Sequence, residues 1–431
     1  MLLSSGLYDR LVTDRLLIPH EEEAGPAGDP HVELILRPEQ IRSLSYPYEW
    51  CFGQLKDAAL QTLRIQKAAL KHGMTLKDAS AFNIQFRGCS PVFIDTLSFE
   101  RNDGGPWVAY SQFCRHFLAP LLLMSRISPT FNQYLKVNLD GIPLDLASQL
   151  LPRSTYFHFG ILVHIHLHAR SQKKYAGGEA SPSERAVPQS AADPKPGLTD
   201  SLLELVESLQ LGRFETEWKH YYQTASHYTD VAEKAKRNQV SRILEIIRPS
   251  LVIDLGGNTG EYSRLATQQG IRAVCCDVDP MCVQQNYERS KAERDEFLLP
   301  LLMDLTNPTP DLGFALEERS SLLARADADL VLVLALIHHL RITGNIPLLR
   351  IAEFLASMGR RVLVEFVPKE DVMVQKMLRA RPDTFFDYTE EQFRVAFAEY
   401  FEIEERVALE GSPRSLYLLK TRKAEGARSD G

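Results

Sequence analysis

Residues 251–262, LVIDLGGNTGEY, constrain the fold of this 431-residue chain more than any other stretch. An apolar run ends in Asp254 and is followed by a turn that holds Gly256, Gly257 and Gly260. Continuous apolar runs of this kind predict a buried parallel strand, and the glycines indicate a backbone that turns tightly or approaches a ligand closely. Polar residues then open a helical stretch, so the sequence predicts the order strand, Gly-rich turn, helix.

Spacing separates three nucleotide-binding loops that share this order. A P-loop needs Lys directly after its last glycine, where this chain has Glu261. A dinucleotide-binding fingerprint counted from Gly256 requires glycines at the positions of Asn258 and Glu261. The remaining pattern, acid-x-Gly-x-x-x-Gly from Asp254 to Gly260, resembles motif I of the class I S-adenosylmethionine (SAM) methyltransferases.

Polar residues also stand at the ends of four further apolar runs, which predict other strands of the same sheet. The runs and their polar residues are 271–278 with Asp277, 298–303 followed by Asp304, 330–336 followed by His338 and His339, and 362–367 with Glu365. Open α/β sheets bind ligands at the carboxyl ends of their parallel strands, so these side chains are expected along one edge. The resemblance to class I methyltransferases extends over residues 250–422.

This resemblance implies a fold for residues 249–422. The expected architecture is a Rossmann-like, seven-stranded class I methyltransferase sheet with helices on both faces. Its last two strands are expected at residues 401–408 and 415–421. A terminal β-hairpin that completes a mostly parallel sheet is the usual ending of the resembled family.

The same resemblance implies SAM as the cofactor and assigns its contacts. The turn expected against the methionine and ribose portions consists of Gly256, Gly257, Asn258 and Gly260. Asp254 is expected to fix the amino end of the cofactor. Asp277 stands about 20 residues past the first glycine and is expected to bind the ribose hydroxyls. Asp304 is expected beside the adenine amine.

The acceptor side is expected to include two histidines. His338 and His339 follow the fourth strand, where the resembled enzymes place residues near the transferred methyl group. A histidine with a pKa near neutrality can act as a base, so both are candidate catalytic residues, and one of the pair is equally expected to be structural. Glu365 is a candidate substrate-binding residue or an ordinary polar strand end. Tyr228 and Tyr222 are candidates for closing the pocket over cofactor and substrate, or for packing on the sheet.

Composition and short motifs indicate the kind of partner. The net charge of −7 argues against non-specific binding of nucleic acid. The His-His-Leu sequence after the fourth strand lacks the Asn/Asp-Pro-Pro-aromatic signature of amino-directed nucleic-acid methyltransferases. A small-molecule acceptor is therefore expected, with no nucleic-acid or membrane partner and the oligomeric state open. Six cysteines without a Cys-x-x-Cys pair, and an N-terminus without a signal-peptide pattern, predict a reducing cytoplasm.

A second motif stands in the N-terminal region. Asp78 and Asn83 have D-x-x-x-x-N spacing, and an apolar strand that ends in Asp95 follows. The pattern resembles the catalytic loop and magnesium-binding core of kinase-like phosphotransferases. No Gly-rich phosphate loop and no V-A-I-K-like strand precedes it. We therefore expect Asp78 and Asn83 to cap a turn and Asp95 to end a strand, with a kinase-like phosphotransferase as the alternative function.

Three alternating histidines, His164, His166 and His168, form a further candidate site. In a strand they would share one face, which favours metal binding. In a helix, residues two apart do not face each other. No carboxylate or cysteine ligand stands nearby, so we expect polar histidines in contact with the neighbouring domain and no metal.

The composition of the linker sets the expected domain boundaries. The expected organisation is 1–170, an N-terminal mixed α+β region resembling a reduced kinase C-lobe that binds the acceptor; 171–198, a flexible Ser-, Ala-, Pro- and Gly-rich linker; 199–248, a helical cap of the second domain; 249–422, the methyltransferase core; and 423–431, a disordered tail. The whole chain resembles bacterial methyltransferases, some of them nodulation-linked, that carry a kinase-like N-terminal region. A non-catalytic SAM-binding scaffold is a further alternative.

Overall fold

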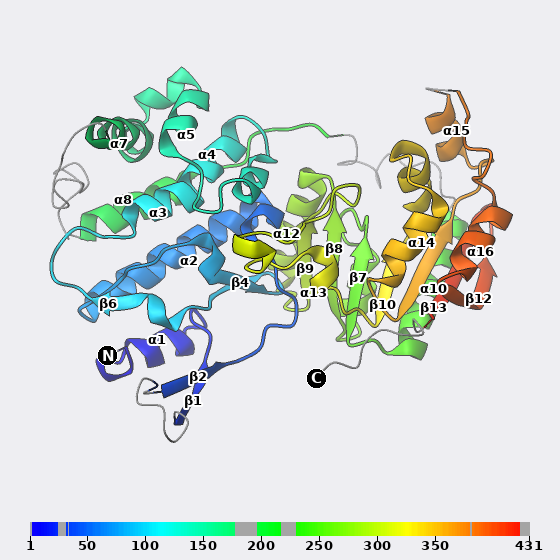
Figure 1. Ribbon diagram of the computed structural model, residues 1–431, viewed down its shortest axis with the longest axis horizontal. Coiled ribbons are helices and arrows are strands. Elements are labelled where there is room, and N and C mark those ends of the chain that lie inside the picture. The colour runs from blue at the N-terminus through cyan, green and yellow to red at the C-terminus, as the bar shows by residue number, and fades with distance from the viewer. Residues whose placement is uncertain are drawn as a thin grey trace. The chain divides into compact units, whose positions relative to one another are not determined.

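A computed structural model describes residues 2–24, 32, 34–176, 196–216, 230–379 and 382–422. The chain divides into two compact units, Met1–Phe214 and Glu215–Gly431 (Figure 1). Each unit has its own buried core, and we describe the two units separately. None of the helices in the described ranges is long and apolar enough to cross a bilayer.

Unit 1 is mainly helical. Its α-helices are α1 (Leu7–Thr13), α2 (Phe52–Lys71), α3 (Tyr110–Phe113), α4 (Ala119–Arg126), α5 (Leu144–Leu150), α6 (Phe159–Ile161), α7 (His168–Ala176) and α8 (Pro196–Ser208). Three antiparallel strand pairs accompany them: β1 (His20–Ala24) with β2 (Leu34–Pro38), β3 (Met74–Leu76) with β6 (Phe99–Arg101), and β4 (Ile84–Arg87) with β5 (Ser90–Phe93). π-Helical segments follow α3 and α6 at η5 (Cys114–Leu118) and η8 (Leu162–Leu167).

Helix α2 forms the centre of unit 1, as its apolar spacing predicts. Leu55, Ala59 and Leu63 recur at every fourth position and are completely buried. The Gln54 side chain accepts a hydrogen bond of 3.0 Å from the Cys51 backbone N–H, which satisfies a donor before the first turn. The helix therefore begins at Phe52 and continues to Lys71 with one face in the core.

Helix α8 also belongs to unit 1, which differs from the expected domain boundary. The sequence analysis places residues 199–248 with the second domain, but α8 packs on α2. Lys67 forms an ion pair of 2.6 Å with Asp200, and the Lys56 ammonium group donates to the Leu209 carbonyl oxygen at 2.7 Å. Leu202 is buried in the same unit. Most of the expected linker, residues 177–195, lies outside the described residues, as does the tail 423–431.

Unit 2 is built on one seven-stranded sheet. Its strands are β7 (Leu251–Leu255), β8 (Arg272–Asp277), β9 (Leu298–Leu302), β10 (Leu330–Val333), β11 (Arg361–Phe366), β12 (Phe401–Ala408) and β13 (Ser415–Thr421). The spatial order is β12-β13-β11-β10-β7-β8-β9. Strands β7 to β11 are parallel, β13 runs antiparallel to β11, and β12, which pairs antiparallel with β13, runs in the same direction as β7 to β11. Read from β9, the first five positions follow the Rossmann order 3-2-1-4-5.

Helices cover both faces of this sheet, as expected. They are α10 (Asp230–Ile247), α11 (Ser263–Thr267), α12 (Pro280–Glu293), α13 (Leu322–Arg325), α14 (Leu348–Ala356), α15 (Val372–Leu378) and α16 (Glu390–Ala398). The chain moves from β7 toward β9 and, after β10, in the opposite direction. With the right-handed crossovers that are usual for parallel strands, this order predicts α11 and α12 on one face and α14 on the other.

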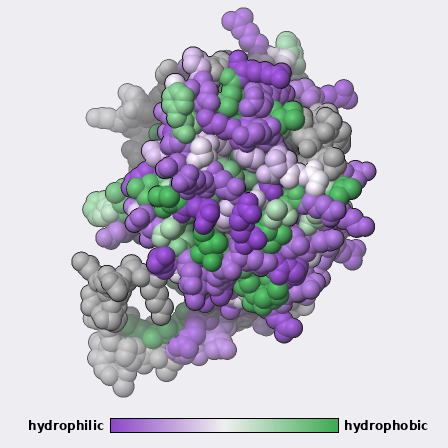
Figure 2. All heavy atoms as spheres, turned by 90° about the vertical axis from the view of Figure 1, so that its right-hand side faces the viewer, coloured by the Kyte–Doolittle hydropathy of each residue, from purple (hydrophilic) through white to green (hydrophobic). Residues whose placement is uncertain are grey.

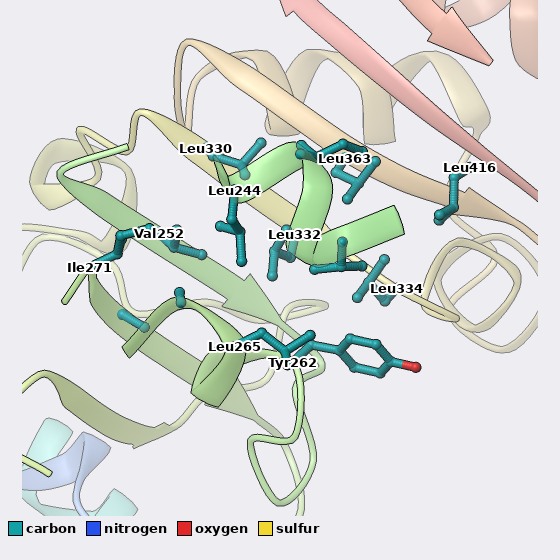
Figure 3. Close-up of a cluster of buried hydrophobic side chains, with 14 of the residues drawn as sticks. Leu244, Val252, Tyr262, Leu265, Ile271, Leu330, Leu332, Leu334, Leu363 and Leu416 are labelled. Carbon is teal, nitrogen blue, oxygen red and sulfur yellow. The ribbon is translucent and has the colours of Figure 1, made fainter. Parts of the chain in front are cut away.

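A cluster of buried apolar side chains joins α10 and α11 to the sheet (Figure 3). Leu244 of α10 belongs to the same cluster as Val252, Leu332 and Leu363, which lie on three neighbouring strands. Tyr262 precedes α11 and lies at the end of the cluster near the arrowhead of β7 (Figure 3). The core therefore continues up to the carboxyl edge of the sheet.

Strand β12 is the last strand at one side of the sheet, and its charged residues protect it from pairing with another chain. Its residues alternate between buried or half-buried and exposed positions, and Glu402, Glu404 and Arg406 are exposed. Figure 2 views the molecule from the side on which β12 and α16 lie, and this surface is mostly hydrophilic with scattered apolar residues. Charged residues on an exposed edge strand disfavour pairing with another chain.

Candidate functional site

The Gly-rich turn is attached to the neighbouring strand by its backbone. The N–H groups of Gly256 and Gly257 both donate to the Cys276 carbonyl oxygen, at 2.8 and 3.1 Å. Gly256 and Gly260 have φ angles of 72° and 80°, in the left-handed region that favours glycine. The turn therefore lies at the carboxyl ends of β7 and β8, where the sequence predicts it.

Gly257 has no room for a side chain. A Cβ atom there would lie 2.4 Å from the Cys275 sulfur and 2.8 Å from an oxygen of Asp254. Real Cβ contacts essentially never fall below 3.0 Å. Gly257 is buried and packs tightly against β7 and β8, so only glycine fits at this point of the turn.

Asp277 ends β8 directly beside this turn. One carboxylate oxygen accepts a hydrogen bond of 2.8 Å from the Asn258 N–H, and the other accepts one of 2.8 Å from the Asp279 N–H. Burial raises the pKa of Asp277 to about 6, so the group is mainly ionised at pH 7. The structure therefore brings the predicted turn and the predicted acid together, with Asn258 as the link.

Asp254 ends the first strand in a buried position. Its carboxylate accepts a hydrogen bond of 2.6 Å from the Ser263 hydroxyl, which connects β7 to the first residue of α11. Burial raises the pKa of Asp254 to about 6. The group is thus mainly ionised at pH 7 and holds the start of the helix under the turn.

Asp304 lies one strand further along the same edge and is exposed. It follows Met303, whose N–H donates 2.8 Å to the carbonyl oxygen of Asp277. Its carboxylate accepts hydrogen bonds from the backbone N–H and the hydroxyl of Thr306 at 2.8 and 2.7 Å. Asp277 and Asp304 are therefore neighbours along the sheet edge, although the Asp304 side chain closes its own turn.

The two candidate histidines follow β10 through a sharp turn. Ala335 has a φ of 52°, which is uncommon for a residue with a side chain. The next residue, Leu336, packs against the Gly-rich turn, because a Cβ atom added to Gly256 would lie 3.0 Å from the Leu336 side chain. The rings of His338 and His339 have centroids 4.2 Å apart, and His339 begins the π-helical segment η10 (His339–Thr343).

Both histidines are neutral at pH 7. Burial lowers the pKa of His338 well below its usual value, and the charges of Arg414 and Lys236 add to this effect. Burial, followed by the charge of Arg414, lowers the pKa of His339 to about 4. The Nδ1 atom of His338 is buried without a hydrogen-bond partner among the described residues. This buried nitrogen at the carboxyl ends of the strands can still form a hydrogen bond with a ligand.

Glu365 lies near the end of β11 and is completely buried. Its Oε2 atom lies 2.6 Å from the Lys236 ammonium group, and its Oε1 atom accepts a hydrogen bond of 3.2 Å from Arg414. Arg414 also binds Asp371 through two hydrogen bonds of 2.7 and 3.0 Å. Glu365 is therefore more than an ordinary polar strand end.

The sequence analysis missed the three partners in this network, Lys236, Arg414 and Asp371. Arg414 lies in the terminal hairpin, and Asp371 precedes α15. Arg414 has no local motif, and Asp371 has only the pattern of a helix N-cap, which does not reveal a charged partner. Lys236 had a detectable signal, because it stands four residues before Val240 on the stripe of α10 that faces the core. Tyr222 and Tyr228 lie outside the described residues.

The acids of the N-terminal motif have local partners. Asp78 accepts a hydrogen bond of 2.9 Å from the Ser80 N–H, and Asp95 accepts one of 2.8 Å from the Leu97 N–H. Asn83 donates to the Ser98 hydroxyl at 3.3 Å. The prediction that Asp78 caps a turn is confirmed, whereas Asp95 lies two residues beyond the end of β5 and caps the following turn, and the Asn83 side chain contacts Ser98 instead of capping a turn. Among the residues that the structure describes, no three His, Cys, Asp or Glu side chains are placed to hold a metal ion.

The three alternating histidines lie in helical turns of unit 1, at η8 and the start of α7. His164 contacts the Tyr110 hydroxyl at 2.8 Å, and His166 contacts the Ser148 hydroxyl at 2.7 Å. His168 stacks on Tyr110 with ring centroids 4.9 Å apart. The segment is therefore helical, and these three contacts form within unit 1 rather than with the expected neighbouring domain.

Sheet order, Gly-rich turn and edge acids together define a Rossmann-like fold of the class I methyltransferase type. No protein-family model matches the sequence. The chain is 35% identical over 391 residues to the nodulation protein NoeA of Rhizobium meliloti (strain 1021), which covers 89% of this chain and 81% of that protein. The chain belongs to the family of the nodulation protein NoeA.

Solved structures give much weaker similarities. The magnesium protoporphyrin IX methyltransferase ChlM from Synechocystis PCC 6803, with bound S-adenosylhomocysteine, is 18% identical and covers 44% of this chain and 84% of its own, with a TM-score of 0.33. The N-methyltransferase NodS from Bradyrhizobium japonicum WM9 is 15% identical and covers 44% of this chain and 97% of its own, with the same TM-score. These TM-scores are too low to carry an argument, so the fold rests on the sheet itself.

Proposed function

We propose that this protein is a SAM-dependent methyltransferase whose second unit holds the cofactor. The observation that carries the proposal is the pairing of the Gly-rich turn with Asp277, whose carboxylate is buried, mainly ionised and held by the backbone of Asn258. An ionised carboxylate at this position is suited to accept both hydroxyl groups of a ribose. The close packing of Gly257 against β7 and β8 keeps the turn beside this carboxylate.

In this proposal, each predicted residue of the cofactor side has a distinct task. Gly256 and Gly260 let the main chain approach the cofactor, and Asp254 holds the turn to α11. Asp277 binds the ribose, and Asp304 lies where the adenine edge would follow along the sheet. When bound, SAM supplies an electrophilic methyl group on a sulfonium, which needs no acid to leave.

On the acceptor side, the proposal distinguishes the two histidines. His338 contacts the acceptor through Nδ1, and the adjacent ring of His339 supports it. A base with a pKa well below neutrality removes protons weakly at pH 7, so His338 mainly orients the acceptor. Positioning of two reactants in a site that excludes water supplies a large part of the acceleration in such a transfer. We expect a small molecule as the acceptor.

Calorimetric titration with S-adenosylhomocysteine tests this function. We expect the parent protein to bind and Asp277→Ala to lose at least about tenfold in affinity, because a charge-assisted hydrogen bond to the ribose is removed. Asp327→Ala is the matched control. That acid precedes β10 at the amino ends of the parallel strands, and its side chain is 84% exposed. A folded parent that does not bind S-adenosylhomocysteine would contradict the proposal.

A further inference from the structure

Four charged side chains form a buried network at the carboxyl ends of the strands in unit 2. Lys236 pairs with Glu365 at 2.6 Å, and Arg414 joins Glu365 to Asp371 through bonds of 3.2, 2.7 and 3.0 Å. Every member is at most 7% exposed. The two cations and two carboxylates sum to zero charge. Burial of four charges is expensive, so their arrangement calls for a physical explanation.

Lys236 stands where the two halves of the candidate site meet. Its ammonium group lies 4.5 Å from the centre of the Tyr262 ring, two residues beyond Gly260. Burial lowers the pKa of Lys236, and the charges of Glu365 and Asp254 act in the opposite direction. The same ammonium group acts on His338. The charge of Lys236 therefore acts on residues of both the cofactor side and the acceptor side.

The charge of Glu365 matters for a cofactor that is itself a cation. A buried carboxylate without a counter-charge would attract the sulfonium strongly, because Coulomb interactions are strong in a poorly solvated site. That charge is dispersed in the transition state of methyl transfer. A carboxylate that stabilises bound SAM more than the transition state would raise the free-energy barrier between them. In such a site, a buried carboxylate raises this barrier less when a neighbouring cation neutralises its charge.

We propose that Lys236 is a positioning residue that neutralises Glu365, so that the site does not bind the sulfonium of SAM through this carboxylate. The inference rests on the function proposed above. Both oxygens of Glu365 are engaged within the protein, one by Lys236 and the other by Arg414. Glu365 therefore acts through its neighbours rather than as a direct ligand of the substrate, and the network shapes the potential around His338.

A purely structural ion pair would give a different result from this charge-balancing role. Loss of a structural pair weakens the binding of SAM and S-adenosylhomocysteine by the same factor. Loss of a charge-balancing lysine affects the two ligands differently, because SAM carries the sulfonium and S-adenosylhomocysteine carries a neutral sulfur. The ratio of the two dissociation constants therefore separates the roles and does not depend on the acceptor.

Calorimetric titrations with both ligands on the full chain provide the test. In Lys236→Met, Glu365 loses a counter-charge, and we expect the affinity for SAM relative to S-adenosylhomocysteine to rise about tenfold. Lys236→Arg keeps the charge, and the double variant Lys236→Met/Glu365→Gln removes both charges. We expect the parent ratio in both.

Three outcomes are decisive. An unchanged ratio in a folded Lys236→Met variant would overturn the inference, and so would a raised ratio in the double variant. Should Lys236→Met fail to fold, the double variant can still contradict the inference, because it leaves no buried lysine or glutamate charge unpaired and any departure from the parent ratio would overturn it. Failure of the parent to bind S-adenosylhomocysteine would instead count against the proposed function.

Discussion

The two halves of the candidate site are built in different ways. The cofactor half is a local structure, in which residues 254–260 and Asp277 are joined by backbone hydrogen bonds between adjacent strands. The acceptor half depends on side chains that are far apart in the sequence, since Lys236 and Glu365 come from α10 and β11. A turn that is held by local backbone hydrogen bonds can be predicted from a sequence motif. A long-range charge network is set by tertiary packing, so no motif in the sequence reveals it.

The largest effect is expected in the acceptor half. Glu365→Gln removes the acid that pairs with both Lys236 and Arg414, so that the buried Lys236 ammonium group loses this ion pair while Arg414 keeps Asp371. Breaking a buried ion pair by removing one partner costs about 3–5 kcal/mol. We expect a loss of this size in the free energy of unfolding, measured with urea.

Glu404→Gln is the control for this loss. Glu404 pairs with Arg361 at 2.8 Å on the surface, where ion pairs contribute about 0–1 kcal/mol. Equal losses in the buried and the surface variant would show that the acceptor half does not depend on its buried network.

A smaller loss of stability, with a large loss of binding, is expected in the cofactor half. Gly257→Ala forces a Cβ atom against Cys275 and Asp254, and overpacking of this kind costs about 1–3 kcal/mol. The displaced turn should also lose affinity for S-adenosylhomocysteine, measured by calorimetry. Gly197→Ala serves as the control, because a Cβ atom there meets nothing within 4 Å. Full affinity in Gly257→Ala would refute the role of the tight turn.

The smallest effect is a pH dependence that belongs to the cofactor half. Burial raises the pKa of Asp277 to about 6, above its value in the unfolded chain. The folded state thus binds the proton more readily, and the contribution of Asp277 to stability falls as the pH rises from about 4 to about 6. Protonation removes the charge that accepts the ribose hydroxyls.

The affinity for S-adenosylhomocysteine should therefore decrease as the pH falls below about 6, by at most about tenfold per pH unit. Titrations at several pH values check this expectation, with Asp277→Asn as the reference whose affinity should vary less. A parent affinity that is constant from pH 7 to pH 5 would contradict the ionised-acid role.

Sequence reasoning reached the fold of unit 2 because its signals are local. The runs that end at Asp254 and Asp277 are central strands buried on both sides, and their apolar character alone reveals them. Sequence reasoning missed Arg414, because nothing near a hairpin turn announces a partner on β11. It also placed α8 in the wrong unit, since the linker composition marks a break in the chain but does not show which core buries Leu202.

The thiols beside the Gly-rich turn give the site a chemical reporter. Cys275 and Cys276 are buried in β8, and burial raises the pKa of Cys275 well above its usual value. Only the thiolate reacts quickly with alkylating reagents, so these cysteines stay inert while the strand is packed. Alkylation at Cys275 therefore requires the edge of the sheet to open. Its rate, with and without ligand, would measure how often this edge opens in solution.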